Sequence, residues 1–176
     1  MAEVEIHTEH EHAKDPFGQR VGVMIGIIGI ILAVVTIASH RAHTATIIAK
    51  TEANDQWTFF GAKKVREHLL DVGAGLATAL GGDKDSVRDL ANGYRHERDR
   101  YKGEAEAIAV EAHKKEVESG TEEKRALRLD VGEGFLELGL VLSSLYFLSK
   151  RKFFPVLGGI AAVVGVVFSA IGFLLT

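Results

Sequence analysis

Two carboxyl groups, Glu133 and Glu137, lie four residues apart in an otherwise apolar stretch of the chain. Four residues are about one helical turn, so both side chains project from the same face of a helix. A carboxylate inside a bilayer costs roughly 2.5–3.5 kcal/mol, and acids in such places often serve ion or proton pathways. Glu137 is therefore either a pathway group or a packed carboxyl that is hydrogen-bonded to a hydroxyl such as that of Thr36.

Glu137 is the deeper of the two acids. If Asp130 marks the membrane boundary, Glu137 lies about 10 Å below it, at about 1.5 Å per residue. We therefore expect it to face protein or water, or to be protonated. Glu133 can reach the interface, where we expect Arg41 to extend toward it.

His40 and His43 are three residues apart, so both could face one metal ion from a helix. Glu133 would lie about 8–12 Å from their level, too far to complete a compact site. The histidines of the amino-terminal tail (His7, His10 and His12) have no fixed geometry. We expect an interfacial belt rather than a metal site, and no cofactor.

The elements that position these groups are three apolar blocks separated by a charged middle. The first block, residues 21–39, contains no charged residue in 19 positions and is long enough to cross a bilayer as a helix. The pattern predicts an all-α protein with membrane spans at 21–39, 129–149 and 153–176. Residues 1–20 read as a mobile, acidic, histidine-bearing tail.

Residues 40–128 predict a long antiparallel, coiled-coil-like helical hairpin outside the bilayer. Its tip is expected at 81–86 and a helix break at 119–121, and each leg reaches about 60 Å. A heptad register predicts the residues of the first leg that face the second, in a thin seam that other chains could share. They are Ile48, Thr51, Asp55, Thr58, Ala62, Val65, Leu69, Val72, Leu76 and Ala79. The second leg should pack through Val87, Leu90, Tyr94, Tyr101, Ala105, Ile108 and Ala112.

Two spans carry small residues at alternating spacings of four and three, which let helices approach closely in lipid. They are Gly22, Gly26, Gly29 and Ala33 in the first span, and Gly158, Ala162, Gly165, Ser169 and Gly172 in the third. We expect these stripes to pack within one subunit or between copies. In the hairpin, Asp55 could specify register, and Trp57 and Phe60 should form a subunit or hairpin contact.

The run Asn54-Asp55-Gln56-Trp57-Thr58-Phe59-Phe60-Gly61-Ala62-Lys63 resembles a bacterial membrane-protein family of unknown function, the DUF4337 family. A His-x-x-His exit from the first span and a Ser-x-basic-basic loop between the last two spans add to the resemblance, which covers most of the chain after residue 20. Gly61 stands where a larger polar residue is expected. The resemblance implies this topology and a bacterial origin, and it implies no activity.

Composition excludes several classes of function. The chain has no cysteine, so disulfides and thiol nucleophiles are absent. Residues 40–130 hold 16 Lys and Arg against 17 Asp and Glu, which argues against a nucleic-acid partner. No phosphate-binding loop, nucleophile elbow or zinc-protease motif occurs, so we expect no enzyme.

The loop 150–152 is Lys150-Arg151-Lys152, and short basic loops mark the cytoplasmic side. The predicted location is a bacterial inner membrane, with a cytoplasmic amino terminus and the hairpin outside. The leading hypothesis is a membrane scaffold that self-associates or serves a larger assembly as an accessory subunit. An oligomeric ion or proton conductor using Glu137 is the alternative, and a metal-responsive protein is the third.

Overall fold

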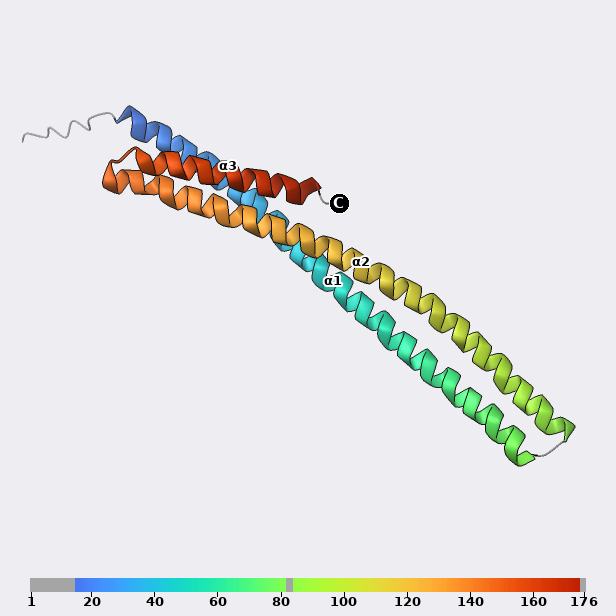
Figure 1. Cartoon of the computed structure of the whole chain (residues 1–176). Helices are drawn as coiled ribbons and strands as arrows, with labels where there is room; N and C mark the ends of the chain where they lie inside the picture. The colour runs from blue at the N-terminus through green and yellow to red at the C-terminus, as the bar shows by residue number, and fades with distance from the viewer. Residues whose placement is uncertain (1–14, 82–83, 175–176) are drawn as a thin grey trace, which may run out of the picture. The chain divides into compact units, whose positions relative to one another are not determined.

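The computed structural model describes residues 15–81 and 84–174. This part of the chain folds into three α-helices and no strand: α1 (Pro16–Gly81), α2 (Asp85–Ser149) and α3 (Phe153–Leu174) (Figure 1). The all-α class is confirmed. Most of the predicted tail, residues 1–14, and two residues of the predicted tip, 82–83, lie outside the described residues.

Each of the three helices contains a segment long and apolar enough to cross a membrane. The helix ends match the predicted loop, because α2 stops at Ser149 and α3 starts at Phe153. Lys150 ends α2 in a left-handed conformation, with φ of 55°, and its N–H donates to the Tyr146 carbonyl at 2.7 Å. That bond closes the last helical turn, although a glycine would adopt this conformation at lower cost.

The start of α1 is capped by Asp15. The Gly18 N–H donates to Asp15 Oδ1 at 2.8 Å, and Pro16 takes the first helical position, where its missing N–H costs nothing. The Tyr146 hydroxyl also donates to this carboxylate at 3.0 Å. The Gly18 N–H, then Tyr146 and then Lys150 hold the pKa of Asp15 below its usual range. The charged cap thus ties the start of α1 to the end of α2.

The predicted break at 119–121 is wrong, because α2 runs through it without interruption. Thr121 does not cap a new helix; its hydroxyl donates back to the Val117 carbonyl at 3.1 Å, inside the same helix. A single glycine costs a helix only about 1 kcal/mol, and Gly120 lies among Glu, Lys, Arg and Ala, which favour helix. Packing of α2 against α1 therefore outweighs the tendency of the Ser-Gly-Thr sequence at 119–121 to interrupt a helix.

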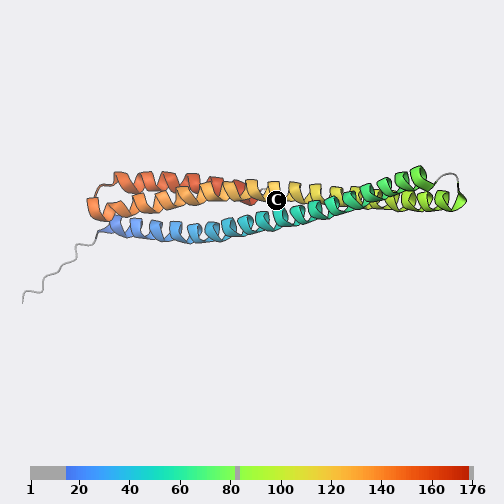
Figure 2. The ribbon, with the colours of Figure 1, turned by 90° about the horizontal axis from the view of Figure 1, so that it is seen from below.

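The described chain divides into two compact units. Unit 1 contains residues 15–37 and 129–171, and unit 2 contains residues 38–81, 84–128 and 172–174. In unit 1, segments of α1, α2 and α3 lie alongside one another (Figure 2). Its core repeats every seven residues along α1 and α2, through Val21, Ile28, Val35, Leu129 and Leu136.

In unit 2 the segments of α1 and α2 run antiparallel, and the buried positions alternate at spacings of four and three. The buried members are Ser39, Ala42, Thr46, Ala49, Ala53 and Ala74 on α1, and Ala91, Ala105, Ala112, Ser119 and Ala126 on α2. We call these positions, with the half-buried ones that continue their spacing, the alanine seam. Small side chains let the two backbones approach closely along it.

The heptad register predicted for the first leg is wrong. All ten predicted positions are exposed, from Ile48 to Ala79. Each lies two residues beyond a position of the alanine seam, which is about 200° around the helix. The predicted stripe therefore covers the back of α1. On the second leg, six of the seven predicted residues are buried or half-buried, and Leu90 is 50% exposed.

Candidate functional site

Glu133 forms a hydrogen bond with Thr36 in unit 1. The Thr36 hydroxyl donates to Glu133 Oε1 at 2.7 Å, and both side chains are half-buried. The sequence suggested Thr36 as a partner for the deeper acid, but Glu137 lies one turn farther along α2. In an antiparallel helix pair that turn moves it away from the level of Thr36. The shallower acid is therefore the packed one.

Glu137 is exposed on the surface of unit 1, and no described residue forms a hydrogen bond or ion pair with it. Leu138 and Val141, both exposed, are its apolar neighbours. A carboxyl on such a surface is not stabilised by this chain alone. Arg41, the partner predicted for Glu133, is exposed and belongs to unit 2. Its pairing with Glu133 stays a prediction.

His40 and His43 are exposed on α1. Within residues 15–81 and 84–174, no group of three or more His, Asp or Glu side chains is placed to hold a metal ion. The tail histidines lie outside the described residues. Among the described residues, His40 and His43 therefore belong to no such group.

The small-residue stripe of α3 is packed against α2. An ideal Cβ built on Gly165 would lie 2.7 Å from the Gly132 carbonyl oxygen, and one on Gly158 would lie 2.6 Å from that of Gly139. No side chain fits at either position without movement. Ala162 and Ser169 are also buried, and so is Gly172, which belongs to unit 2.

The small-residue stripe of α1 is open. A Cβ built on Gly22 or Gly26 would meet no atom within 4 Å, and Ala33 is exposed. At Gly29 the nearest atom is Leu140 Cδ1, at an ordinary contact distance of 3.9 Å. This face of α1 is therefore free of close contacts within the described chain.

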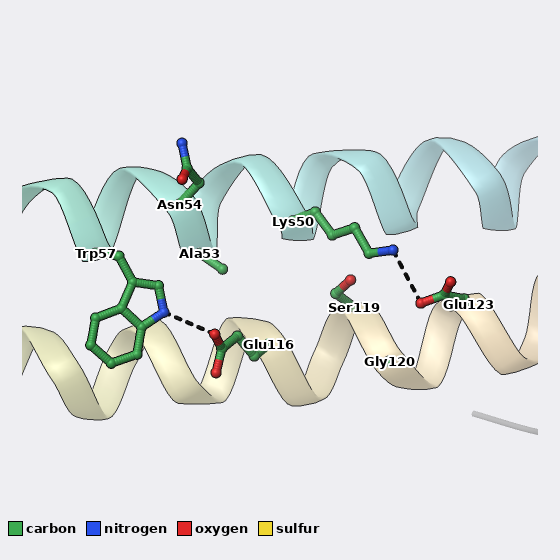
Figure 3. Close-up of a pocket in the computed structure, with 8 residues that line it drawn as sticks. All are labelled: Lys50, Ala53, Asn54, Trp57, Glu116, Ser119, Gly120 and Glu123. Atoms are coloured by element: carbon green, nitrogen blue, oxygen red, sulfur yellow. Dashed lines mark hydrogen bonds and ion pairs between the residues drawn. The ribbon is translucent and has the colours of Figure 1, made fainter.

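Trp57 crosses the alanine seam of unit 2 and binds a carboxylate on α2 (Figure 3). Its Nε1–H donates to Glu116 Oε1 at 2.9 Å, while His113 Nδ1 lies 2.9 Å from Glu116 Oε2. The Trp57 bond, and then that of His113, hold the pKa of Glu116 below its usual range. Phe60 packs edge-on against Trp57 on the same helix, with 5.4 Å between ring centres. Within the described chain, only Trp57 of the two has a bond to the second leg, so the predicted subunit or hairpin contact of Phe60 stays a prediction.

A groove of about 360 Å³ opens beside Trp57 (Figure 3). Its lining residues are Lys50, Ala53, Asn54, Trp57, Glu116, Ser119, Gly120 and Glu123. Lys50 Nζ lies 3.1 Å from Glu123 Oε2, so those charges are paired. Ser119 is 3% exposed, and its buried hydroxyl has no hydrogen-bond partner in the described part of the chain. Water entering the groove could satisfy it.

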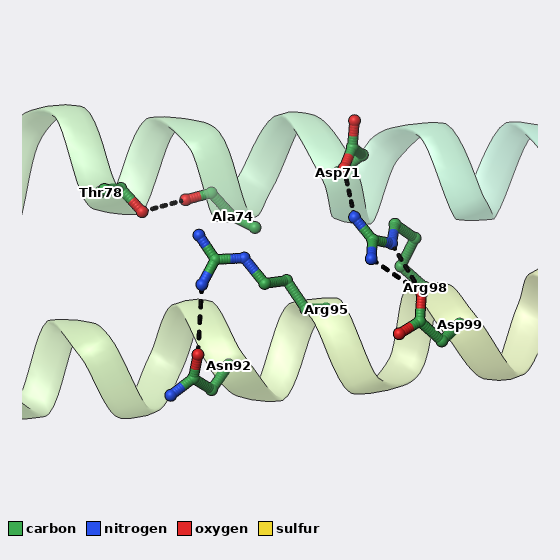
Figure 4. A network of polar contacts seen from close by, with 7 residues as sticks. All are labelled: Asp71, Ala74, Thr78, Asn92, Arg95, Arg98 and Asp99. Atoms are coloured by element: carbon green, nitrogen blue, oxygen red, sulfur yellow. Dashed lines mark hydrogen bonds and ion pairs between the residues drawn. The ribbon is translucent and has the colours of Figure 1, made fainter.

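Further ion pairs cross the alanine seam toward the tip. Arg98 donates across the seam to Asp71 at 2.9 Å (Figure 4). Within α2, Arg98 also donates to Asp99 at 2.8 Å, and Arg95 donates to Asn92 at 3.2 Å. Asp71, and then Asp99, raise the pKa of Arg98. Lys63 pairs with Glu104, and Lys115 with Glu52. These pairs alternate in sign along the legs and specify their alignment.

Sequence reasoning missed Glu116, His113 and Ser119. For Ser119 a signal existed, because Ala112, Ser119 and Ala126 are spaced by seven and continue one helical face. The Ser-Gly-Thr composition suggested a break instead. Glu116 has no such signal, since its role depends on the alignment of two distant segments.

Comparisons with known proteins identify a family and no activity. No curated protein and no solved structure matches the chain. The family model described as a domain of unknown function, DUF4337, matches residues 17–175. Those residues include all of the three-helix architecture except the first position of α1. The chain belongs to the DUF4337 family.

Proposed function

We propose that this protein is a non-enzymatic integral membrane scaffold. It crosses the bilayer three times, through residues 21–39, 129–149 and 153–174, and it carries the antiparallel, coiled-coil-like hairpin outside. The lengths of the three apolar segments support the spans. The nearly balanced charges and cross-leg ion pairs of unit 2 support a water-exposed hairpin.

The proposed orientation places the amino terminus and the loop 150–152 in the cytoplasm of a bacterium, and the hairpin beyond the inner membrane. Aromatic and basic residues gather at the loop end of unit 1. Phe17 packs edge-on against Tyr146 with ring centres 5.0 Å apart, and Lys152 Nζ lies 5.2 Å from the Phe17 ring. Such a belt is typical of a membrane interface with cytoplasmic cations.

The scaffold associates with further copies through α1. The observation that carries this proposal is the open stripe at Gly22 and Gly26, where a built Cβ would meet no atom of the described chain within 4 Å. In lipid, small residues favour association because they let a second helix approach closely. If the stripe served a contact within the described chain, another helix would pack against it, as α2 does against the stripe of α3. Alternatively, the stripe receives another protein and the chain is an accessory subunit.

Native mass spectrometry of the protein released from detergent micelles tests this assignment. We expect wild type and Ile27→Leu to give the same homo-oligomer, and Gly26→Leu to give mainly monomer. Ile27 is a matched control because it is exposed in the same span and the change adds no volume. A monomeric wild type would overturn self-association. A complex with another protein would favour the accessory-subunit form.

A second candidate function is an oligomeric ion or proton conductor. It is favoured by one observation: Glu137 is exposed among apolar neighbours. An acid at membrane depth usually faces protein or water, so other copies would line a path with it. In liposomes, the wild type and Glu133→Gln should dissipate a pH gradient, whereas Glu137→Gln should not. Absence of any flux from the wild type would exclude this function.

A further inference from the structure

The back of α1 in unit 2 carries a row of large aliphatic side chains that no part of the described hairpin covers. Val65, Leu69, Val72 and Leu76 follow one another at spacings of four, three and four, and each is more than half exposed. We call these four residues the distal stripe. Leu69 is the most exposed of the four, at 66%. Water-exposed helices of this kind usually bury such a row against another helix.

The second leg cannot be the partner of the distal stripe. Alpha1 meets α2 through the alanine seam, which in this region includes Glu67, Leu70 and Ala74. Each residue of the distal stripe lies two positions beyond a residue of that seam, about 200° around the helix. The helix therefore has two heptad faces on opposite sides. The hairpin packs through the alanine seam and leaves the distal stripe uncovered.

Two glycines on one edge of the distal stripe support a close neighbour. Gly61 and Gly75 are fourteen residues apart, or two heptads, and a Cβ built on either would meet nothing within 4 Å. Only proline forms helix less readily than glycine, and no contact within the described hairpin requires a glycine at these positions. A Cβ built on Gly73, by contrast, would lie 3.4 Å from the Tyr94 ring. The open glycines would let a second helix approach.

We propose that the distal stripe pairs with the distal stripe of a second copy of this chain, in parallel. The parallel direction rests on the proposed function, since copies inserted alike in one membrane point the same way. Parallel pairing places Val65, Leu69, Val72 and Leu76 opposite their own counterparts, so every core contact is apolar. Arg66, beside the stripe, then lies near Gly61 of the other copy rather than near a like charge.

Charge also determines where this contact ends. Continuing the register toward the membrane places Asp55 opposite its own counterpart, and two like charges there would repel each other. We therefore confine the contact to residues 61–79. The proposal thus explains why the aliphatic residues of the back face gather in the distal half of the leg, while Thr51, Asp55 and Thr58 occupy the proximal half.

The absence of cysteine makes a direct test possible. Leu69→Cys and the control Lys64→Cys are each introduced into the full chain, and isolated membranes are oxidised with copper phenanthroline. Both positions are exposed, but Lys64 lies off the stripe. We expect most Leu69→Cys to form a disulfide-linked dimer, with at least a tenfold lower yield for Lys64→Cys. Equal yields, or an adduct whose mass is not twice that of the chain, would overturn the proposal.

Leu69→Glu provides a second readout, because an exposed substitution should leave the helices intact. We expect its circular dichroism to match the wild type while the oligomer loses mass in native mass spectrometry. The membrane scaffold and the distal contact fail in different ways. A chain that does not sediment with membranes contradicts the proposed function. A membrane-bound oligomer that is sensitive to Gly26→Leu but gives no Leu69→Cys dimer contradicts only the pairing of the distal stripe.

Discussion

The small-residue stripes of α1 and α3 share composition and spacing, yet only that of α3 is filled within the chain. At Gly158 and Gly165 the α2 backbone is so near that no Cβ could be added, whereas a Cβ built on Gly22 or Gly26 would meet no atom of residues 15–81 and 84–174 within 4 Å. The comparison teaches that such a stripe predicts a close helical neighbour without saying whether the neighbour belongs to the same chain.

The reason for the difference lies in α2. Close approach of two backbones needs small residues on both helices. Alpha2 offers one such face, formed by Gly132, Gly139 and Ser143, and α3 occupies it. Alpha1 instead meets the other helices of unit 1 through larger residues such as Val21, Ile28 and Val35. Its glycines remain available.

The largest expected effect comes from filling the closed stripe. Gly165→Leu would force atoms against the Gly132 carbonyl and Leu136, and overpacking of this kind costs about 1–3 kcal/mol or more. The matched change Gly22→Leu, in the open stripe, should alter the free energy of unfolding by less than about 0.5 kcal/mol. Thermal unfolding in detergent, followed by circular dichroism, measures both. Equal losses would contradict the distinction between closed and open stripes.

Unit 2 permits the same comparison between its two faces. Ala112 is completely buried in the alanine seam, so Ala112→Leu should destabilise the chain by about 1–3 kcal/mol. Leu69 is exposed on the opposite face, and Leu69→Ala should cost the monomer no more than about 0.5 kcal/mol. Urea unfolding at a concentration where the protein is monomeric compares the two. If Leu69→Ala proved the more damaging, the register of the legs would be the one predicted from sequence.

A smaller effect separates the two acids of α2. Thr36→Val removes the donor to Glu133 and should reduce the free energy of unfolding by about 1 kcal/mol, the usual contribution of such a bond. Glu137→Gln should leave folding of the monomer nearly unchanged, because no described residue binds Glu137. Thermal unfolding of the two variants in the same detergent tests this difference. A stable Thr36→Val variant would show that the bond contributes little.

The smallest effect concerns pH. Folding lowers the pKa of Glu116 below its ordinary value of 4.5, so the stabilisation is fully present above that pH. It is lost as the pH falls through the lower pKa of the folded chain. Trp57→Phe removes the main hydrogen-bond donor and should move the pKa of Glu116 back toward 4.5. Carboxyl titration by nuclear magnetic resonance measures this shift, with Phe60→Leu as a control that keeps the donor.

Much of the architecture is local and could be predicted from the sequence. The three helices, the tip region and the loop 150–152 follow from the lengths of apolar runs and from glycine and charge at their ends. These features depend on neighbours within a few residues, so no knowledge of distant contacts is needed. The false break at Ser119 shows the limit of that reasoning, since a turn-like composition was outweighed by packing against another leg.

The sequence by itself also determined that α1 has a heptad period and that unit 1 has two small-residue stripes. Only the tertiary structure decided which heptad row of α1 faces the second leg, and which small-residue stripe is packed within the chain. Both Ile48 and Ala49 begin rows that repeat every seven residues, and hydrophobicity favours the row of Ile48. The legs instead close on the alanines, because small side chains and pairs such as Asp71 with Arg98 must match across two distant segments. That match is a property of the pair of helices and cannot be obtained from either one alone.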